Sequence, residues 1–350
     1  MSGHVTPSAV QAGSAITAAE MAAILRTADL RQSAVTVVGY GKMGAQYVKA
    51  LQALGCSQLT VCSRSAAPLA GLEGVGGIEV VAGGVERLTR RAQPGELAIV
   101  ATPTLSLVDV TERLAALGYQ RVLIEKPVSL WSSEITQLAQ RLERQGIEAV
   151  CAYNRVAYPS LLEARWRAQE EGGITSCTYT FTEFIKRLDL TKYPPEELAR
   201  WGIANSLHVI SMAHALIGFP STWQGHRAGS LPWHPTGAVF AGSGKSERGT
   251  PFAYHADWGS TGRWSVEFHT PVSSYRLCPL EQLFRRTEPT ADWAPVPVEA
   301  FAPEVKVGFA EQAAAMLNPV LRERIPLVSL RQAAALTRLT EDIFGYARKQ

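Results

Sequence analysis

Two segments in the first half of the chain carry residue types and spacings that could do chemistry. The first is the glycine-rich loop Gly39-Tyr40-Gly41-Lys42-Met43-Gly44, which follows the apolar run 35–38 and precedes a helix-forming run. In a G-x-G-x-x-G loop, the first glycine permits a tight turn, the second lets the backbone approach a pyrophosphate, and the third allows close packing of helix and strand. The loop predicts a dinucleotide site, and the competing interpretation is a purely structural turn.

The second segment is Glu125-Lys126-Pro127, at the end of the apolar run 122–125. Ligands of open α/β sheets bind at the carboxyl edge of the strands, where this lysine would lie. Its amine could hydrogen-bond a substrate hydroxyl or carbonyl and move the proton during hydride transfer. The alternative is a strand-ending lysine that faces solvent.

The strand after the glycine loop ends in Ser63-Arg64-Ser65. A site that prefers NAD usually has Asp or Glu at this point, where the carboxylate holds the ribose 2′-hydroxyl. Arg64 can instead hold a 2′-phosphate through charge-assisted hydrogen bonds. The segment therefore favours NADP(H) over NAD(H), against the alternative of an ordinary surface loop.

The elements that must position these residues follow two patterns. Between residues 34 and 152, short β-branched runs alternate with stretches of helical periodicity, which predicts a doubly wound parallel sheet of Rossmann type with helices on both faces. Beyond residue 174, most strands are expected to be joined by Gly, Pro and Ser clusters, which is typical of hairpins. The fold class is thus α/β, with a C-terminal α+β domain built on a mostly antiparallel sheet. The expected strands of this second domain are 175–183, 222–227, 238–242, 252–258, 263–269 and 273–278.

Length and composition agree with two domains. The chain has 350 residues, of which 46% are hydrophobic and 19% charged, enough to bury a full core. We expect an N-terminal extension with a short helix at 1–33, a dinucleotide-binding domain at 34–152, a substrate and oligomerisation domain at 153–328, and a C-terminal helix at 329–350 that packs back on the dinucleotide-binding domain.

Charge and cysteine usage exclude several classes of protein. Lys and Arg number 34 against 31 for Asp and Glu, so charge indicates neither a nucleic-acid partner nor a membrane surface. The five cysteines are scattered without C-x-x-C spacing, which argues against a disulfide scaffold or a metal site. No apolar run approaches the roughly 20 residues of a membrane span, and residues 1–20 lack a secretory signal pattern. We therefore expect a cytoplasmic protein with a small-molecule substrate.

Together, the glycine loop, Glu125-Lys126-Pro127, Ala101-Thr102-Pro103 and Tyr153-Asn154-Arg155 resemble the Gfo/Idh/MocA oxidoreductase family, which includes glucose–fructose oxidoreductase and inositol dehydrogenase. The resemblance implies an open C-terminal sheet that forms subunit contacts, hence a homodimer or homotetramer. It also implies cofactor contacts from residues along the carboxyl edge of the first sheet: Gly39, Tyr40, Gly41, Lys42, Met43, Gly44, Ser63, Arg64, Ser65, Ala101, Thr102, Pro103, Glu125 and Lys126. The resemblance further implies a cis peptide bond between Lys126 and Pro127, because the corresponding Lys-Pro bond of the family is frequently cis.

The family's next catalytic segment, D-x-G-x-H-x-x-D, corresponds to residues 204–211. His208 is retained, whereas Ala204 and Ser211 stand at the positions of the two aspartates, so proton handling must differ here. Lys126 and His208 are the expected catalytic residues, and the alternative for His208 is a core histidine. Substrate contacts are expected from Tyr153, Asn154, Arg155, Trp201, Asn205 and His208.

The resemblance, taken with the NADP(H) preference read from Arg64, implies an NADP-dependent oxidoreductase that transfers a hydride to or from a C–OH or C=O group of a sugar, sugar nucleotide or polyol. Two alternatives stay open because the aspartates are missing. One is a C=N imine reductase in a biosynthetic pathway, since a protonated imine makes smaller demands on a proton relay. The other is a non-catalytic regulatory protein that senses the dinucleotide.

Overall fold

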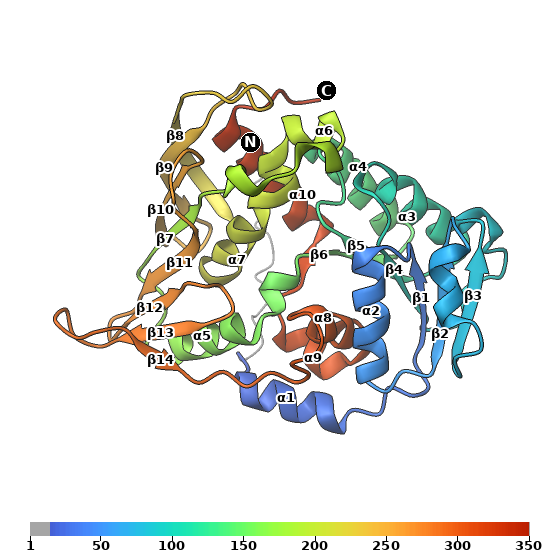
Figure 1. The fold of residues 1–350 in the computed structure, drawn as a ribbon. Helices are drawn as coiled ribbons and strands as arrows, with labels where there is room; N and C mark the ends of the chain where they lie inside the picture. The colour runs from blue at the N-terminus through green and yellow to red at the C-terminus, as the bar shows by residue number, and fades with distance from the viewer. Residues whose placement is uncertain (1–14, 350) are drawn as a thin grey trace, which may run out of the picture.

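The computed structural model describes residues 15–349 and contains two sheets with helices between them (Figure 1). The first fourteen residues of the expected N-terminal extension lie outside this range. The short helix expected within residues 1–33 is α1 (Ala18–Thr27). It begins with a capping box in which Thr17 and Glu20 satisfy each other's backbone N–H groups.

The first sheet has seven strands in the order β15-β6-β5-β4-β1-β2-β3. The first six strands of the chain pair in parallel, and the short β15 joins β6 antiparallel. The expected doubly wound parallel sheet is confirmed. The strands are β1 (Ala34–Val38), β2 (Gln58–Ser63), β3 (Ile78–Ala82), β4 (Leu97–Val100), β5 (Arg121–Glu125), β6 (Glu148–Ala152) and β15 (Val328–Ser329).

Helices cover both faces of this sheet because its strands are apolar on both sides. Helices α3 (Leu107–Ala116) and α4 (Ser132–Arg144) pack on one face, in one apolar cluster. Helices α2 (Lys42–Ala53) and α8 (Phe309–Leu317) pack together on the other face, in a second cluster. Helix α8 returns to the first sheet from the far end of the chain, followed by the short α9 (Pro319–Arg324).

The second sheet has eight strands in the order β14-β13-β12-β11-β7-β10-β9-β8. Only β7 and β10 pair in parallel, so the expectation of a mostly antiparallel sheet is confirmed. The strands are β7 (Ser176–Phe181), β8 (Pro220–Ala228), β9 (Val239–Ser246), β10 (Pro251–Asp257), β11 (Trp264–His269), β12 (Ser274–Leu277), β13 (Leu283–Arg286) and β14 (Ala294–Val296).

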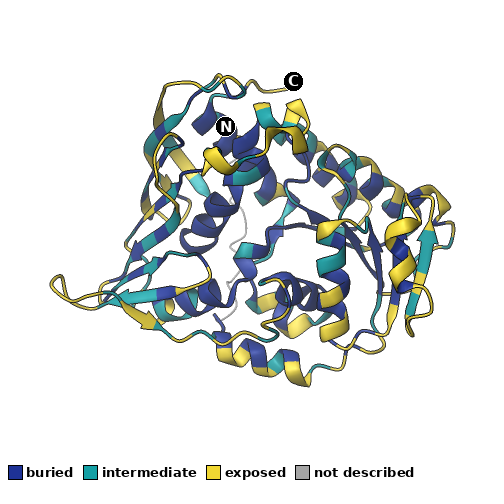
Figure 2. Ribbon diagram, in the orientation of Figure 1, coloured by how far each residue is buried: buried dark blue, intermediate teal, exposed yellow. Residues whose placement is uncertain are grey.

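Three helices fill the space between the two sheets: α5 (Pro159–Glu170), α7 (Leu207–Ile217) and α10 (Leu330–Phe344). Helix α7 packs on β7 and β11, while α10 contacts α4 of the first half as well as β8 of the second sheet. These helices are dark blue over most of their length in Figure 2, because both sides of the layer are covered.

Short helical segments connect the larger elements. Helix α6 (Pro195–Ala199) precedes a π-helical turn, Gly202–Ser206, which continues into α7. Short 3-10 segments occupy Ala67–Leu72, Val85–Arg87, Thr104–Ser106, Asn154–Ala157, Ile185–Arg187 and Leu190–Lys192. None of the helices within residues 15–349 is both long and apolar enough to cross a membrane.

Candidate active site between the two sheets

The glycine loop lies where the strand order of the first sheet reverses, between β1 and β4. Gly39 has a φ of 98°, and a Cβ there would lie 2.4 Å from the carbonyl oxygen of Ala101. A Cβ on Gly44 would lie 1.8 Å from the carbonyl oxygen of Gly39. Both glycines are therefore required by the protein's own backbone, as the sequence motif predicts.

Gly41 differs from its two neighbours in the motif. A Cβ on Gly41 would meet nothing within 4 Å, so the fold alone does not explain this glycine. Gly41 caps the N-terminus of α2 without a side-chain hydrogen bond. The absence of a side chain leaves the first N–H groups of the helix open to an anion, which is the arrangement that a dinucleotide pyrophosphate requires.

A cavity of about 700 Å³ opens above this helix terminus. Its wall also contains the buried hydroxyl of Thr102, which has no hydrogen-bond partner among the described residues. An unpartnered buried hydroxyl and an unexplained glycine both fit a bound dinucleotide. The expected cofactor residues that the cavity brings together are Gly39, Tyr40, Gly41, Lys42, Met43, Ser63, Arg64, Ser65, Ala101, Thr102 and Pro103. Gly44, Glu125 and Lys126 do not line it.

One end of the cavity is formed by the loop after β2. Ser63, Arg64 and Ser65 lie there together with Glu86, which the sequence analysis did not single out. A Cβ on Gly84 would lie 2.8 Å from the Glu86 carboxylate and 3.3 Å from Cγ of Arg64, so both side chains approach the same glycine. This end of the site thus offers one guanidinium and one carboxylate to a bound ribose.

Lys126 follows β5 at the carboxyl edge of the sheet, as predicted. The Lys126–Pro127 bond is cis, and Val128 has a φ of 70°, a conformation that is rare for a β-branched residue. The Lys126 amine donates a 2.7 Å hydrogen bond to the carbonyl oxygen of Ala204, in the π-helical turn. Lys126 therefore joins the dinucleotide-binding half of the molecule to the half that contains His208.

The neighbouring Glu125, the last residue of β5, directs its carboxyl toward α2. It accepts a 3.1 Å hydrogen bond from the Tyr47 hydroxyl, which in turn accepts one of 2.7 Å from Gln312 of α8. Burial raises the pKa of Glu125, and the Lys126 charge opposes that shift. Burial likewise lowers the pKa of Lys126, and Glu125 opposes the shift. A lysine with a lowered pKa is better suited to proton transfer near neutral pH.

The π-helical turn that accepts from Lys126 is fixed from two sides. On one side, the Gly202 N–H donates a 2.9 Å hydrogen bond to the Tyr346 hydroxyl, and a Cβ on Gly202 would lie 2.4 Å from the Phe344 ring. On the other side, Glu183 accepts from Asn205 Nδ2 at 2.8 Å and from Ser206 Oγ at 2.6 Å. The position of the Ala204 carbonyl, and with it that of Lys126, depends on both sides.

Glu183 is a candidate site residue that the sequence analysis did not assign. It follows β7 and is buried, and burial raises its pKa from 4.5 to about 7. Its position beside Asn205 depends on the pairing of distant segments, and no local pattern announces it. Among the described residues, it places a carboxyl close to the turn where the family's first aspartate is replaced by Ala204.

His208 lies one turn further along, at the start of α7. It is buried, its Nδ1 has no hydrogen-bond partner among residues 15–349, and its ring centroid is 6.1 Å from that of Trp264. Burial holds the pKa of His208 well below its usual range, and the charges of Arg155 and Lys126 act in the same direction. The imidazole is therefore neutral at physiological pH.

The remaining expected substrate residues have different surroundings. Tyr153 is fully buried within the core, and Asn154 donates a 3.0 Å hydrogen bond to the Val307 carbonyl. Trp201 is buried in edge-to-face contact with Tyr193, at a centroid distance of 4.8 Å. The Ser211 hydroxyl, at the position of the family's second aspartate, donates back to the carbonyl of its own helix.

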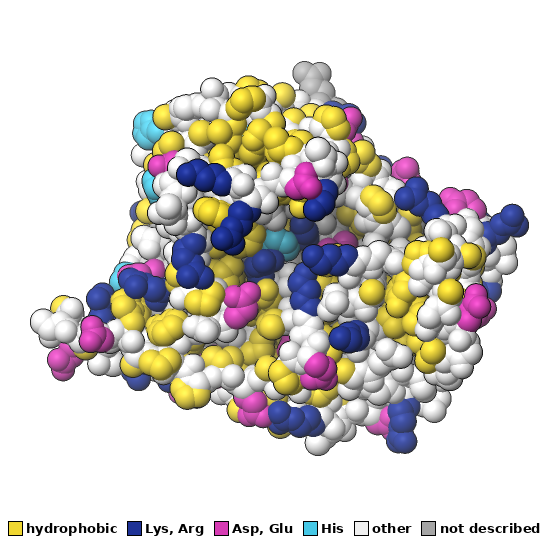
Figure 3. All heavy atoms as spheres, viewed as in Figure 1, with side chains coloured by type: hydrophobic (Ala, Val, Ile, Leu, Met, Phe, Trp, Pro, Cys, Tyr) yellow, Lys and Arg dark blue, Asp and Glu magenta, His cyan; other side chains and the backbone are white. Residues whose placement is uncertain are grey.

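Positive charge gathers around the hollow between the two halves, where Lys and Arg side chains surround the opening (Figure 3). Lys306 contributes to this field: its amine lies 3.4 Å from the sulfur of Met43, and its charge lowers the pKa of His208. The sequence analysis did not single out Lys306. Within residues 15–349, no group of three or more His, Cys, Asp or Glu side chains could hold a metal ion.

Residues 33–153 match the sequence model of an oxidoreductase family with an NAD-binding Rossmann fold. The match covers the glycine loop, the cavity above it and Lys126. The model is that of the Gfo/Idh/MocA family, so over these residues the resemblance read from the sequence motifs is confirmed. A comparison with curated protein sequences found no match.

Solved structures share the fold over nearly the whole chain. An oxidoreductase from Desulfitobacterium hafniense, described as NADPH-dependent, is 14% identical with a TM-score of 0.70, covering 89% of this chain and 94% of its own. UDP-N-acetylglucosamine 3-dehydrogenase from Acidithiobacillus ferrooxidans is 14% identical with a TM-score of 0.65, covering 90% and 97%. Levoglucosan dehydrogenase with NADH and L-sorbose is 15% identical with a TM-score of 0.69, covering 90% and 96%. At such identities the likeness shows a shared fold.

Proposed function

We propose that the protein is an NADP-dependent oxidoreductase that transfers a hydride to or from a C–OH or C=O group of a sugar, sugar nucleotide or polyol. The observation that carries the proposal is the position of Lys126. This residue directly follows β5, and its amine donates a 2.7 Å hydrogen bond to the carbonyl oxygen of Ala204 in the second domain. This arrangement places a proton-carrying group between a dinucleotide-binding domain and a second domain able to hold a substrate. The sugar dehydrogenases among the structural neighbours support the substrate class.

The proposed preference for NADP(H) rests on Arg64. Arg64 lies in the cavity wall between two serines, and it forms no ion pair with a carboxylate among residues 15–349. A guanidinium with free donors can bind a 2′-phosphate in a bidentate manner. Glu86 in the same wall would repel that phosphate, so the strength of the preference depends on the balance of the two side chains.

In the proposed reaction, a bound nicotinamide dinucleotide supplies or accepts the hydride. Lys126 gives a proton to the substrate oxygen or takes one from it, and its hydrogen bond to Ala204 orients the amine for this task. The neutral His208 can donate a hydrogen bond without carrying charge. Glu183 holds the turn that contains Ala204, and it binds its own proton with a pKa of about 7.

We also propose a homodimer or homotetramer that associates through the second sheet. The helices of this domain cover one face of the sheet, and alternate residues such as Thr178 and His255 project from the other, uncovered face of β7 and β10. A cytoplasmic location is supported by the five cysteines, all of which are free thiols, since disulfides are rare in reducing compartments.

The test of the proposed function is the Lys126→Met variant. We expect it to bind NADPH as the wild type does and to lose about 10²–10⁴-fold in turnover, which is the usual contribution of general acid–base catalysis. Activity would be found by screening sugars, sugar nucleotides and polyols for oxidation with NADP⁺, and matched ketones and imines for reduction with NADPH. Lys49→Met, at an exposed lysine of α2 outside the cavity, is the matched control.

The outcomes separate the proposed function from its rivals. Turnover of Lys126→Met close to that of wild type contradicts the role of the lysine. Reduction of imines but not of ketones replaces the proposal with the imine reductase. Tight binding of NADPH without turnover of any compound class favours the regulatory protein.

A further inference from the structure

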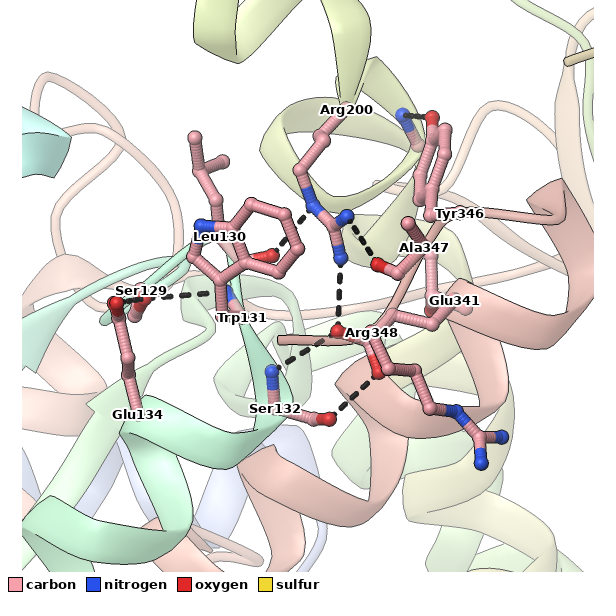
Figure 4. A network of polar contacts seen from close by, with 12 residues as sticks. Ser129, Leu130, Trp131, Ser132, Glu134, Arg200, Glu341, Tyr346, Ala347 and Arg348 are labelled. Carbon is pink, nitrogen blue, oxygen red and sulfur yellow. Dashed lines mark hydrogen bonds and ion pairs between the residues drawn. The ribbon is translucent and has the colours of Figure 1, made fainter. Parts of the chain in front are cut away.

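A buried arginine with a structural role has an acceptor for each guanidinium nitrogen, and Arg200 shows this arrangement (Figure 4). Its Nε donates to the carbonyl of Leu130, Nη1 to the carbonyl of Ala347, and Nη2 to the carboxylate of Glu341, each at 2.8 Å. The carboxylate of Glu341 also accepts from the N–H and hydroxyl of Ser132. Every buried charge in this network has a partner, as burial requires.

Arg155 contrasts with Arg200 in this respect. It lies in the short helical segment that links the two domains, and its Nε is buried without a hydrogen-bond acceptor. In the described part of the chain, none of its N–H groups has an acceptor, and no carboxylate lies within the 4.0 Å of an ion pair. The guanidinium instead lies against aromatic rings, 5.0 Å from the Trp264 centroid and 5.9 Å from that of Tyr158.

Other charged groups around the same space have partners. Lys126 donates to Ala204, and Glu183 accepts from Asn205 and Ser206. The carboxylates of Glu281 and Glu183 act on Arg155 from a distance and partly offset the lowering of its pKa by burial. The neighbouring acidic residues therefore act on the Arg155 charge without forming a hydrogen bond or an ion pair with its guanidinium.

The rings around Arg155 place it at the candidate active site. Trp264 contacts Arg155 on one side and lies 6.1 Å from His208, measured between ring centroids. Arg155 is also the charge that acts most strongly on His208, ahead of Lys126. The unpaired guanidinium and the neutral imidazole thus lie near the same tryptophan, and the Arg155 charge also acts on the lysine amine.

We propose that Arg155 is an oxyanion-binding residue of the substrate site, and that the substrate carries a carboxylate or phosphate on its sugar or polyol framework. Arginine presents a planar fork of N–H donors that matches both anions, and the flat faces of Trp264 and Tyr158 keep that fork in place. The inference rests on the proposed function in one respect, since Lys126 defines the position of the reacting carbon.

The test compares the binding of neutral and acidic compounds that share a glucose framework. The protein is saturated with NADP⁺, so that the cofactor's own phosphate site is filled. The probes are D-glucose, D-glucuronate, glucose 6-phosphate and UDP-glucose, and the readout is the dissociation constant from calorimetry. We expect at least one acidic probe to bind about 10–100-fold more tightly than glucose, the range for a hydrogen-bonded ion contact. Glucuronate and the phosphates then distinguish a carboxylate from a phosphate as the natural anion.

The variants assign this preference to one side chain. Arg155→Met is expected to abolish the preference, and Arg155→Lys to keep part of it, because the charge remains while the fork is lost. Arg187→Met is the matched control, since Arg187 also lies on an aromatic ring, that of Phe184, in the second domain. Added salt should weaken acidic probes on the wild type and leave glucose unchanged, a result that needs no variant.

Several results would overturn the inference: equal binding of glucose and the acidic probes, no binding of any acidic probe, or a preference that persists in Arg155→Met. Failure of the proposed function gives a different pattern. If NADP(H) does not bind but the preference for anions remains and depends on Arg155, the anion site stands and the dinucleotide assignment falls. If NADP(H) binds and no preference exists, only the anion site falls.

Discussion

The pKa of Glu183 yields a prediction that can be worked out from the structure. Burial raises this pKa from 4.5 to about 7, and Glu183 is only 7% exposed as a residue, so solvent screens its carboxyl little. Between these two pH values, the folded protein keeps a proton that the unfolded chain has released. The free energy of unfolding therefore falls as pH rises through this window, and at 1.36 kcal/mol per pKa unit the total loss is about 3 kcal/mol.

Glu183→Gln removes this titration while preserving the shape of the side chain. The amide oxygen can still accept from Asn205, and the Ser206 hydroxyl can rotate to accept from the new amide. Relative to wild type, the variant should gain about 2.5 kcal/mol in stability between pH 5 and pH 8, because part of the window lies below pH 5. Urea denaturation at the two pH values measures this difference.

Glu311→Gln separates the general effect of a buried carboxyl from the specific one. Burial also raises the pKa of Glu311 to about 7, yet this side chain forms no hydrogen bond with the residues around Lys126. Both variants should gain stability at high pH, but only Glu183→Gln should change the pH profile of turnover near pH 7. A Glu183→Gln variant whose stability follows wild type across this range would refute the reasoning.

Three further predictions concern the cofactor loop and the polar network. Arg64→Ser should weaken NADPH binding about 10–100-fold and leave NADH binding unchanged, as fluorescence titration would show; equal losses for both would contradict the 2′-phosphate contact. Gly41→Ala should fold normally but bind NADPH poorly, whereas Gly44→Ala should unfold more readily, because its Cβ would lie 1.8 Å from a backbone oxygen; thermal unfolding with and without NADPH distinguishes the two. Arg200→Met should cost about 3–5 kcal/mol in urea denaturation, because Glu341 would remain buried without its ion-pair partner, and a loss below 1 kcal/mol would disprove this.

The dinucleotide half of the fold could be predicted from the sequence because its signals are local. Each parallel strand is a short apolar run, and Gly39 and Gly44 are required by contacts within a few residues or with the adjacent strand. The elements that were missed carry weaker local signals. Strand β15 has two residues, and α8 lies far along the chain from the sheet face that it covers.

The candidate site likewise contains residues that the local sequence could place and residues that only the tertiary structure brings together. Lys126 could be placed because a strand end positions it, whereas its partner Ala204 contributes a backbone atom, and no side-chain pattern identifies that. Glu183 reaches Asn205 and Ser206 only after β7 and the π-helical turn have come together. The missing aspartates predict altered proton handling at this turn, but the position of the Glu183 carboxyl near it depends on tertiary structure.

The central claim is that a nicotinamide dinucleotide binds at the Gly39–Gly44 loop and carries the hydride chemistry. The most direct measurement is a titration of the purified protein with NADPH and, separately, with NADH, followed by energy transfer from tryptophan to the bound nicotinamide. The structure predicts one saturable site per chain, with NADPH bound more tightly than NADH and with binding weakened in Gly41→Ala. Binding of neither dinucleotide would contradict the account.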